Sequence, residues 1–243
     1  MQTKSFRIDR YISKQRNINR RDIKLMLAQG RIVINGEVIR EITTIVEEFD
    51  HVLLDGEVLQ NKQAIYIMMN KPLGVVSATK DDVHKTVIDL LPDELTHVAG
   101  SKHDLHIVGR LDLNTTGLLL LTNDSRWSRK LMSPASKVNK VYRVTLQSEL
   151  SDQYIKAFAE GMYFGFEDIT TLPAQLTILS NYVAEVILME GKYHQIKRMF
   201  GRFRNPVLAL HRSAVGNLVL DENLAAGESR ALTSSEINAI FNG

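Results

Sequence analysis

Residues 109–121 read GRLDLNTTGLLLL, and this stretch constrains the fold and chemistry of the chain more than any other. Gly109 and Gly117 frame a short polar loop, and the four leucines that follow are typical of a buried strand. Asp112 lies inside the loop, two positions after Arg110. An aspartate in such a place usually accepts hydrogen bonds from backbone N–H groups and caps a turn. The loop alone therefore leaves both a structural and a chemical interpretation of Asp112 open.

The bulk composition is that of an ordinary globular protein, with 243 residues of which 44% are hydrophobic and 24% charged. The absence of cysteine excludes disulfides, thiolate metal sites and cysteine nucleophiles. The spacing of the seven histidines indicates no metal site, and no phosphate-binding or dinucleotide-binding fingerprint is present, so we expect no metal and no cofactor. No apolar segment has the length of a signal core or a membrane span. We therefore expect a cytoplasmic protein with no membrane partner.

The charges are unevenly distributed along the N-terminal part of the chain. Residues 1–31 carry nine lysines and arginines against two aspartates, whereas residues 37–57 carry seven acids against one arginine. Such asymmetry is typical of a phosphate-binding face, although a solvated charged surface would have the same composition. At helical spacing Arg7, Arg10 and Lys14 share one side of a first helix.

The order of predicted elements divides the chain into two parts. A second helix is expected after Asn19, and hairpin turns at Asn35–Gly36 and Asp55–Gly56 end a small module near residue 60. Residues 61–63 form the predicted linker. From residue 64 to 243, many strands with few, scattered helices predict a mixed, mostly antiparallel β-sheet with flanking helices, so the fold class is α+β. Residues 191–203 are expected to form one amphipathic helix.

The N-terminal part resembles the S4 RNA-binding module, most closely in NRRDIKLMLAQGRIVINGEVI at 19–39. The resemblance covers most of residues 5–60, and we place an S4-like module of two helices and small hairpins at 1–60. S4 modules contact structured RNA through their two helices. The resemblance therefore implies that the helical cations bind RNA, namely Arg7, Arg10, Lys14, Arg20, Arg21 and Lys24.

The remainder of the chain resembles the RsuA and RluA families of pseudouridine synthases. The signature Gly-Arg-Leu-Asp-x-x-Thr-x-Gly-Leu is matched at 109–118, and three further motifs follow the family order: NKPLG at 70–74, KVY at 140–142 and EGKYHQIKRMF at 190–200. The resemblance implies a catalytic carboxylate at Asp112, a tyrosine that stacks on the flipped base at Tyr142, and a basic partner of the carboxylate at Lys197. It also implies RNA contacts from Arg110, Lys71, His194 and Arg198.

Helical geometry separates the two adjacent cations of the last motif. Lys197 falls at the border of the buried face and Arg198 points away from it, so Lys197 is better placed to reach a carboxylate in a partly buried cleft. The closing motif is more similar to the RsuA type. The resemblance therefore implies a monomeric enzyme that isomerises a uridine of 16S ribosomal RNA. Two alternatives stay open: action on 23S ribosomal RNA or transfer RNA, and a catalytically silent RNA-binding factor in ribosome assembly.

Overall fold

The computed structural model describes residues 5–96 and 102–241, which divide into two compact units at Ala64 and Ile65. Both units mix helices with mostly antiparallel strands, so the predicted α+β class is confirmed. Within the described residues, no helix is both long and apolar enough to cross a membrane. The units are described separately below.

The N-terminal unit packs two helices against a small sheet. Its sheet has the order β3-β2-β5-β6, and β1 pairs with β4. Asn19 caps α2 by accepting a hydrogen bond from Asp22 N, and both predicted hairpin turns have two successive residues with positive φ. The last strand reaches Asn61, one residue beyond the predicted end of the module. Its elements are β1 (Phe6–Arg7), α1 (Ile8–Arg16), α2 (Arg20–Ala28), β2 (Ile32–Ile34), β3 (Glu37–Val38), β4 (Ile45–Val46), β5 (His51–Leu54) and β6 (Glu57–Asn61).

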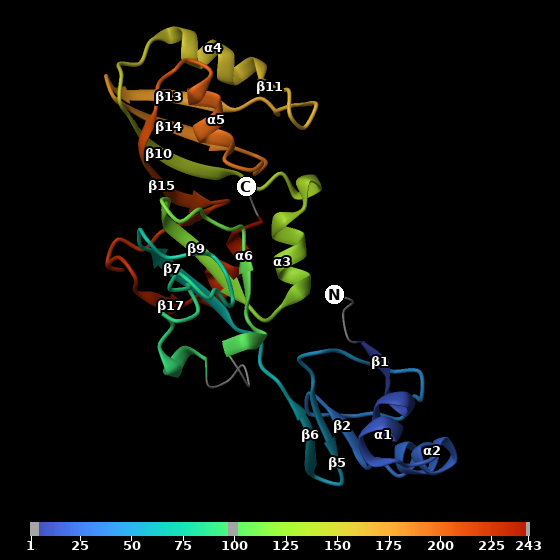
Figure 1. The fold of residues 1–243 in the computed structure, drawn as a ribbon. Coiled ribbons are helices and arrows are strands. Elements are labelled where there is room, and N and C mark those ends of the chain that lie inside the picture. The colour runs from blue at the N-terminus through green and yellow to red at the C-terminus, as the bar shows by residue number, and fades with distance from the viewer. Residues whose placement is uncertain (1–4, 97–101, 242–243) are drawn as a thin grey trace. The chain divides into compact units, whose positions relative to one another are not determined.

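The C-terminal unit is built on one large sheet with the strand order β13-β14-β10-β15-β9-β7-β17, seen along the length of the unit in Figure 1. Strands β8 and β16 pair with β9 and β15, and the β15–β9 ladder is parallel whereas the others are antiparallel. The strands are β7 (Tyr66–Lys71), β8 (His106–Val108), β9 (Thr116–Thr122), β10 (Lys140–Leu146), β13 (Gln175–Ser180), β14 (Val183–Leu188), β15 (Val207–Val215), β16 (Leu218–Val219) and β17 (Ser229–Ala231), with a separate hairpin of β11 (Tyr163–Phe164) and β12 (Ile169–Thr170).

Helices lie beside one end and the middle of this sheet. In Figure 1, α4 and α5 lie near its β13–β14 end, and α3 lies beside β9. The α-helices of this unit are α3 (Ser125–Met132), α4 (Asp152–Glu160), α5 (Gln195–Gly201) and α6 (Ser234–Ala239), and single 3₁₀ turns occupy Asp93–Leu95, Lys102–Asp104 and Pro134–Ser136.

The four-leucine run is buried because β9 is covered on both faces of the sheet. Leu119 and Leu121 belong to one hydrophobic cluster, whereas Leu118 and Leu120 belong to a second. Since successive side chains of a strand point to opposite faces, the two clusters lie on opposite sides of the sheet. Leu111, beside Asp112, belongs to the first cluster, which therefore forms the apolar base under the Asp112 loop.

The predicted helix at 191–203 is shorter in the structure. It begins only at Gln195, because His194 has a φ of 48° and a residue in this left-handed conformation cannot be part of an α-helix. It ends at Gly201, so Phe203 lies beyond the helix, where its ring stacks at 4.3 Å on the ring of Tyr154. The short helix still presents Ile196, Met199 and Phe200 to the core.

Candidate active site

A buried lysine holds the loop that carries Asp112. Lys71 ends β7, is 0% exposed, and donates hydrogen bonds from Nζ to the carbonyl oxygens of Thr115 at 2.9 Å and Pro72 at 3.0 Å. Burial lowers the pKa of Lys71 to about 8, and the charge of Asp112 partly opposes this change. The ammonium group of Lys71 is enclosed by loop carbonyls, which argues against the predicted RNA contact.

A buried arginine fastens both ends of the same loop. Arg212 of β15 is 1% exposed and donates to the carbonyl oxygens of Gly109 at 2.7 Å and Leu118 at 2.8 Å. Gly117 pairs with Arg212 across the parallel ladder with a φ of 104°, and a Cβ there would lie 2.3 Å from the Arg212 carbonyl oxygen. The glycine of the signature is therefore required by a close backbone approach.

A third contact fixes the residue immediately before Asp112. Ser77 Oγ donates to the Leu111 carbonyl at 2.7 Å and lies 3.1 Å from the Leu111 N–H, which donates to it. Within the loop, Thr115 N donates to the Asp112 carbonyl at 3.0 Å and closes a turn. The backbone on both sides of Asp112 is thus tied down, whereas its side chain is left 34% exposed.

Two cationic or protonatable side chains converge on the Asp112 carboxylate. Lys197 Nζ and His194 Nε2 each lie 3.4 Å from Asp112 Oδ2. Lys197 comes from the first turn of α5 and His194 caps the same helix, so the left-handed turn at His194 brings both to the carboxylate. These contacts place a positive charge where it stabilises the ionised acid.

A cavity of about 100 Å³ lies over the carboxylate and is lined by Asp112, Tyr142 and Lys197 among others. A wider groove of about 690 Å³ also includes Asp112, Tyr142 and the exposed Arg110. Tyr142 projects from β10 and is 8% exposed. The structure thus brings the three predicted catalytic residues and Arg110 to one recess, with an aromatic side chain and a carboxylate in its wall.

Arg198 is committed to a different partner. Both of its terminal nitrogens bond to the carboxylate of Glu167, at 2.7 Å and 2.6 Å, and its guanidinium lies 3.8 Å from the centre of the Phe164 ring. The Arg198 hydrogen bonds lower the pKa of Glu167. The structure therefore argues against the predicted RNA contact of Arg198, since the guanidinium already has a bidentate ion pair.

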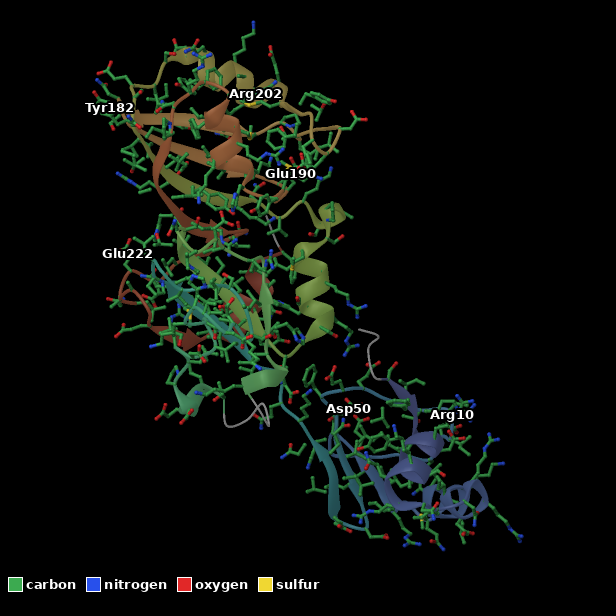
Figure 2. The ribbon with its side chains drawn as sticks, in the orientation of Figure 1. Arg10, Asp50, Tyr182, Glu190, Arg202 and Glu222 are labelled. Atoms are coloured by element: carbon green, nitrogen blue, oxygen red, sulfur yellow. The ribbon has the colours of Figure 1, made fainter. Side chains whose placement is uncertain are left out.

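The predicted RNA-binding cations of the N-terminal unit fall into two groups. Arg7 and Arg20 form ion pairs with the buried Asp9, at 3.0 Å and 3.1 Å. Burial opposes ionisation of Asp9, but the Arg10 backbone N–H and the two guanidinium groups outweigh it and lower the pKa of Asp9. The other four side chains are exposed, as Figure 2 shows for Arg10: Arg10, Lys14, Arg21 and Lys24.

Sequence reasoning missed three features of the recess. It did not place His194 beside Asp112, because that contact depends on a left-handed residue. It did not find Tyr193, which is 70% exposed and stacks on the His194 ring at 3.9 Å. It also did not predict the burial of Arg212, although an arginine within the apolar run at 207–215 is a signal of a buried polar contact. Among the described residues no cluster of His, Asp and Glu is suited to a metal ion.

The family of this chain follows from comparison with known proteins. The family model described as RNA pseudouridylate synthase matches residues 65–201, which include the Asp112 loop, Tyr142 and Lys197. The chain belongs to this family and is an RNA-uridine isomerase, as the sequence predicted.

Its relatives match over nearly their whole length. It is 46% identical to the ribosomal small subunit pseudouridine synthase A of Pseudomonas aeruginosa, over 96% of this chain and 100% of the relative. The protein of the same name from Escherichia coli K12 is 37% identical, over 96% and 99%. A crystal structure of a pseudouridylate synthase superposes with a TM-score of 0.68 at 36% identity, covering 97% of this chain and 99% of that one. The predicted resemblance to the RsuA type is confirmed.

Proposed function

We propose that this chain converts one uridine of small-subunit (16S) ribosomal RNA into pseudouridine. The observation that carries the proposal is the Asp112 carboxylate, exposed in a recess with Tyr142 and held 3.4 Å from Lys197 Nζ. The named small-subunit relatives support the choice of RNA. We place the enzyme in the cytoplasm as a monomer.

The reaction breaks the N1–C1′ bond of uridine, turns the base and joins C5 to C1′. N1 takes up a proton and C5 releases one, with no change of oxidation state, so the chain needs a group that accepts transient bonding or charge rather than an electron carrier. Asp112 supplies that group, by attack on the nucleotide or by stabilising charge while the base detaches. Lys197 places a positive charge 3.4 Å from the carboxylate, and Tyr142 offers a ring on which the everted base stacks.

The remaining cations serve binding. Arg110, exposed at the mouth of the recess, contacts the RNA around the everted nucleotide. His194 positions the carboxylate through its 3.4 Å contact and lines the groove through which the RNA strand passes. The N-terminal unit acts as an S4-like RNA-binding domain through Arg10, Lys14, Arg21 and Lys24, whose exposed charges attract phosphates.

The test is tritium release from transcripts labelled at C5 of uracil, because forming the C5–C1′ bond displaces the C5 hydrogen. The full chain is incubated separately with small-subunit rRNA, large-subunit rRNA and transfer RNA. The proposal predicts release from the small-subunit transcript, at one uridine. Release only from one of the other RNAs would contradict the choice of substrate, and tight binding without release from any RNA would contradict the enzymatic role.

A further inference from the structure

Lys140 is the charged residue of the KVY motif, and the reaction described above gives it no role. It begins β10, two positions before Tyr142, so both side chains project from the same face of the strand. Tyr142 pairs with Arg212 across the antiparallel β10–β15 ladder, which places Arg212 on that face as well. All three line the 690 Å³ groove that also contains Asp112.

Lys140 and Arg212 form a pair of neighbouring cations without a counter-charge of their own. Lys140 Nζ donates to the Val138 carbonyl at 3.3 Å and makes no ion pair within the described residues. Arg212 donates its hydrogen bonds to the carbonyl oxygens of Gly109 and Leu118, which carry no net charge. Burial lowers the pKa of Lys140, and the nearby charge of Arg212 lowers it further.

Glu190, the acid whose charge acts on Lys140, already has other partners. The charge of Glu190 raises the pKa of Lys140, but this effect is weaker than the lowering by burial and by Arg212. One of its oxygens accepts hydrogen bonds from Leu172 N and Gln195 Nε2, both at 2.8 Å, and the other lies 3.8 Å from Lys192 Nζ. Figure 2 shows Glu190 at the end of β14 beside α5, opposite the end that carries Tyr182. Lys140 therefore lies half-buried in a groove with a positive charge that an arriving anion would neutralise.

We propose that Lys140 binds a phosphodiester group of the RNA strand within the groove, next to the nucleotide that enters the Asp112 cavity, with Arg212 adding positive charge behind it. RNA carries one phosphate on each side of any everted nucleotide, so a strand that delivers a base to Asp112 brings anions into the groove that Lys140 lines. The inference rests on the proposed function and assigns a phosphate-binding subsite to the same groove.

The first test removes the charge of Lys140 without removing the length of its side chain. The full-length Lys140→Gln variant is titrated with the small-subunit rRNA transcript at several salt concentrations. We expect about tenfold weaker binding, the worth of one charge-assisted contact, and a salt slope smaller by about 0.7 to 0.9. Lys140→Arg retains most of both. Wild-type affinity and slope in a folded Lys140→Gln protein would overturn the proposal.

A control variant distinguishes the loss of a Lys140–phosphate contact from a change in the net charge of the protein. Lys156 is exposed on α4, outside the groove lining, so Lys156→Gln changes the net charge by the same amount. We expect Lys156→Gln to bind and to respond to salt as the wild type does. Equal losses in the two variants would show that only net charge matters and would overturn the subsite.

The second test acts on the RNA and does not depend on the folding of a variant. Phosphates around the modified uridine are replaced one at a time by neutral methylphosphonates, and binding to the wild-type protein is measured. One replacement should weaken binding about tenfold in the wild type but add no loss in Lys140→Gln, because both changes remove the same contact. A scan in which no single replacement weakens wild-type binding would overturn the proposal. These are binding measurements, so their failure is distinct from absent tritium release by the wild type.

Discussion

Lysine and arginine side chains are used differently in the two units of this chain. In the N-terminal unit, Arg10 and Lys14 stand exposed on α1, where their charges meet water and any approaching polyanion. In the C-terminal unit, Lys71 and Arg212 are 0% and 1% exposed and hydrogen-bond to backbone carbonyls around Asp112. The same residue types are therefore left exposed to solvent in one unit and hold the backbone of the Asp112 loop in the other.

The largest effect should come from the carboxylate of Asp112, in the loop that the buried cations hold. Asp112→Asn retains the size of the side chain but not the charge, so tritium release should fall below detection. RNA affinity should stay within about threefold of the wild type, because phosphate contacts supply most of the binding. Parallel measurement of release and of filter binding checks both. Appreciable turnover in this variant would remove Asp112 from the chemistry.

The next largest effect should come from the cation that contacts this carboxylate. Lys197→Met removes the charge 3.4 Å from Asp112 and should lower kcat by about 100-fold, with KM changed little. Lys197→Arg should restore part of the rate. The control is Arg202→Gln, an exposed cation at the end of the same helix, labelled in Figure 2. If the control lost as much activity as Lys197→Met, the local role of Lys197 would be wrong.

A smaller effect on turnover is expected at the buried lysine. Lys71→Met removes the donor that holds the Thr115 and Pro72 carbonyls, so kcat should fall about tenfold while RNA affinity is retained. Steady-state kinetics with the labelled transcript measure this split. If RNA affinity also fell about tenfold in Lys71→Met, Lys71 would contact RNA despite its burial.

Lys71 also predicts a pH dependence of stability. Its pKa is about 8 in the folded protein and 10.5 in its ordinary state, so between these values the unfolded chain binds more protons. The wild-type free energy of unfolding should therefore rise, relative to Lys71→Met, as the pH increases from 8 to 10.5, by about 3 kcal/mol at most. Urea unfolding of both proteins at pH 7.5 and pH 10 measures the difference. A constant difference across this range would contradict the lowered pKa of the buried Lys71.

The smallest effect per residue should arise on the exposed helix. Arg10→Gln and Lys14→Gln should each reduce the salt slope of RNA binding by at most about 0.9 and leave kcat at saturating RNA unchanged. Arg7 is a poor choice for this test, because it also holds the buried Asp9. Binding isotherms at three salt concentrations are sufficient. A drop in kcat at saturation would show that this unit contributes to the chemistry as well as to affinity.

Features that depend on residues close together in the sequence could be predicted, whereas contacts between distant residues could not. The α+β class, both hairpin turns and the cap at Asn19 follow from neighbouring residues, and all are present in the structure. The separation of Lys197 from Arg198 needed only helical angles, and their partners are indeed different. The burial of Lys71 was not predicted, because it depends on a carbonyl 44 positions away at Thr115. No local pattern reports such a contact.

A crystal structure of the full chain, with a small-subunit rRNA stem that contains 5-fluorouridine at the modified position, would test directly whether Asp112 acts on an everted uridine. We expect this nucleotide to be turned out of the RNA stack into the recess, with its base against Tyr142 and its sugar or base in contact with the Asp112 carboxylate. A fluorinated base that remained stacked in the RNA, or that was bound away from Asp112, would show that Asp112 does not act in this way.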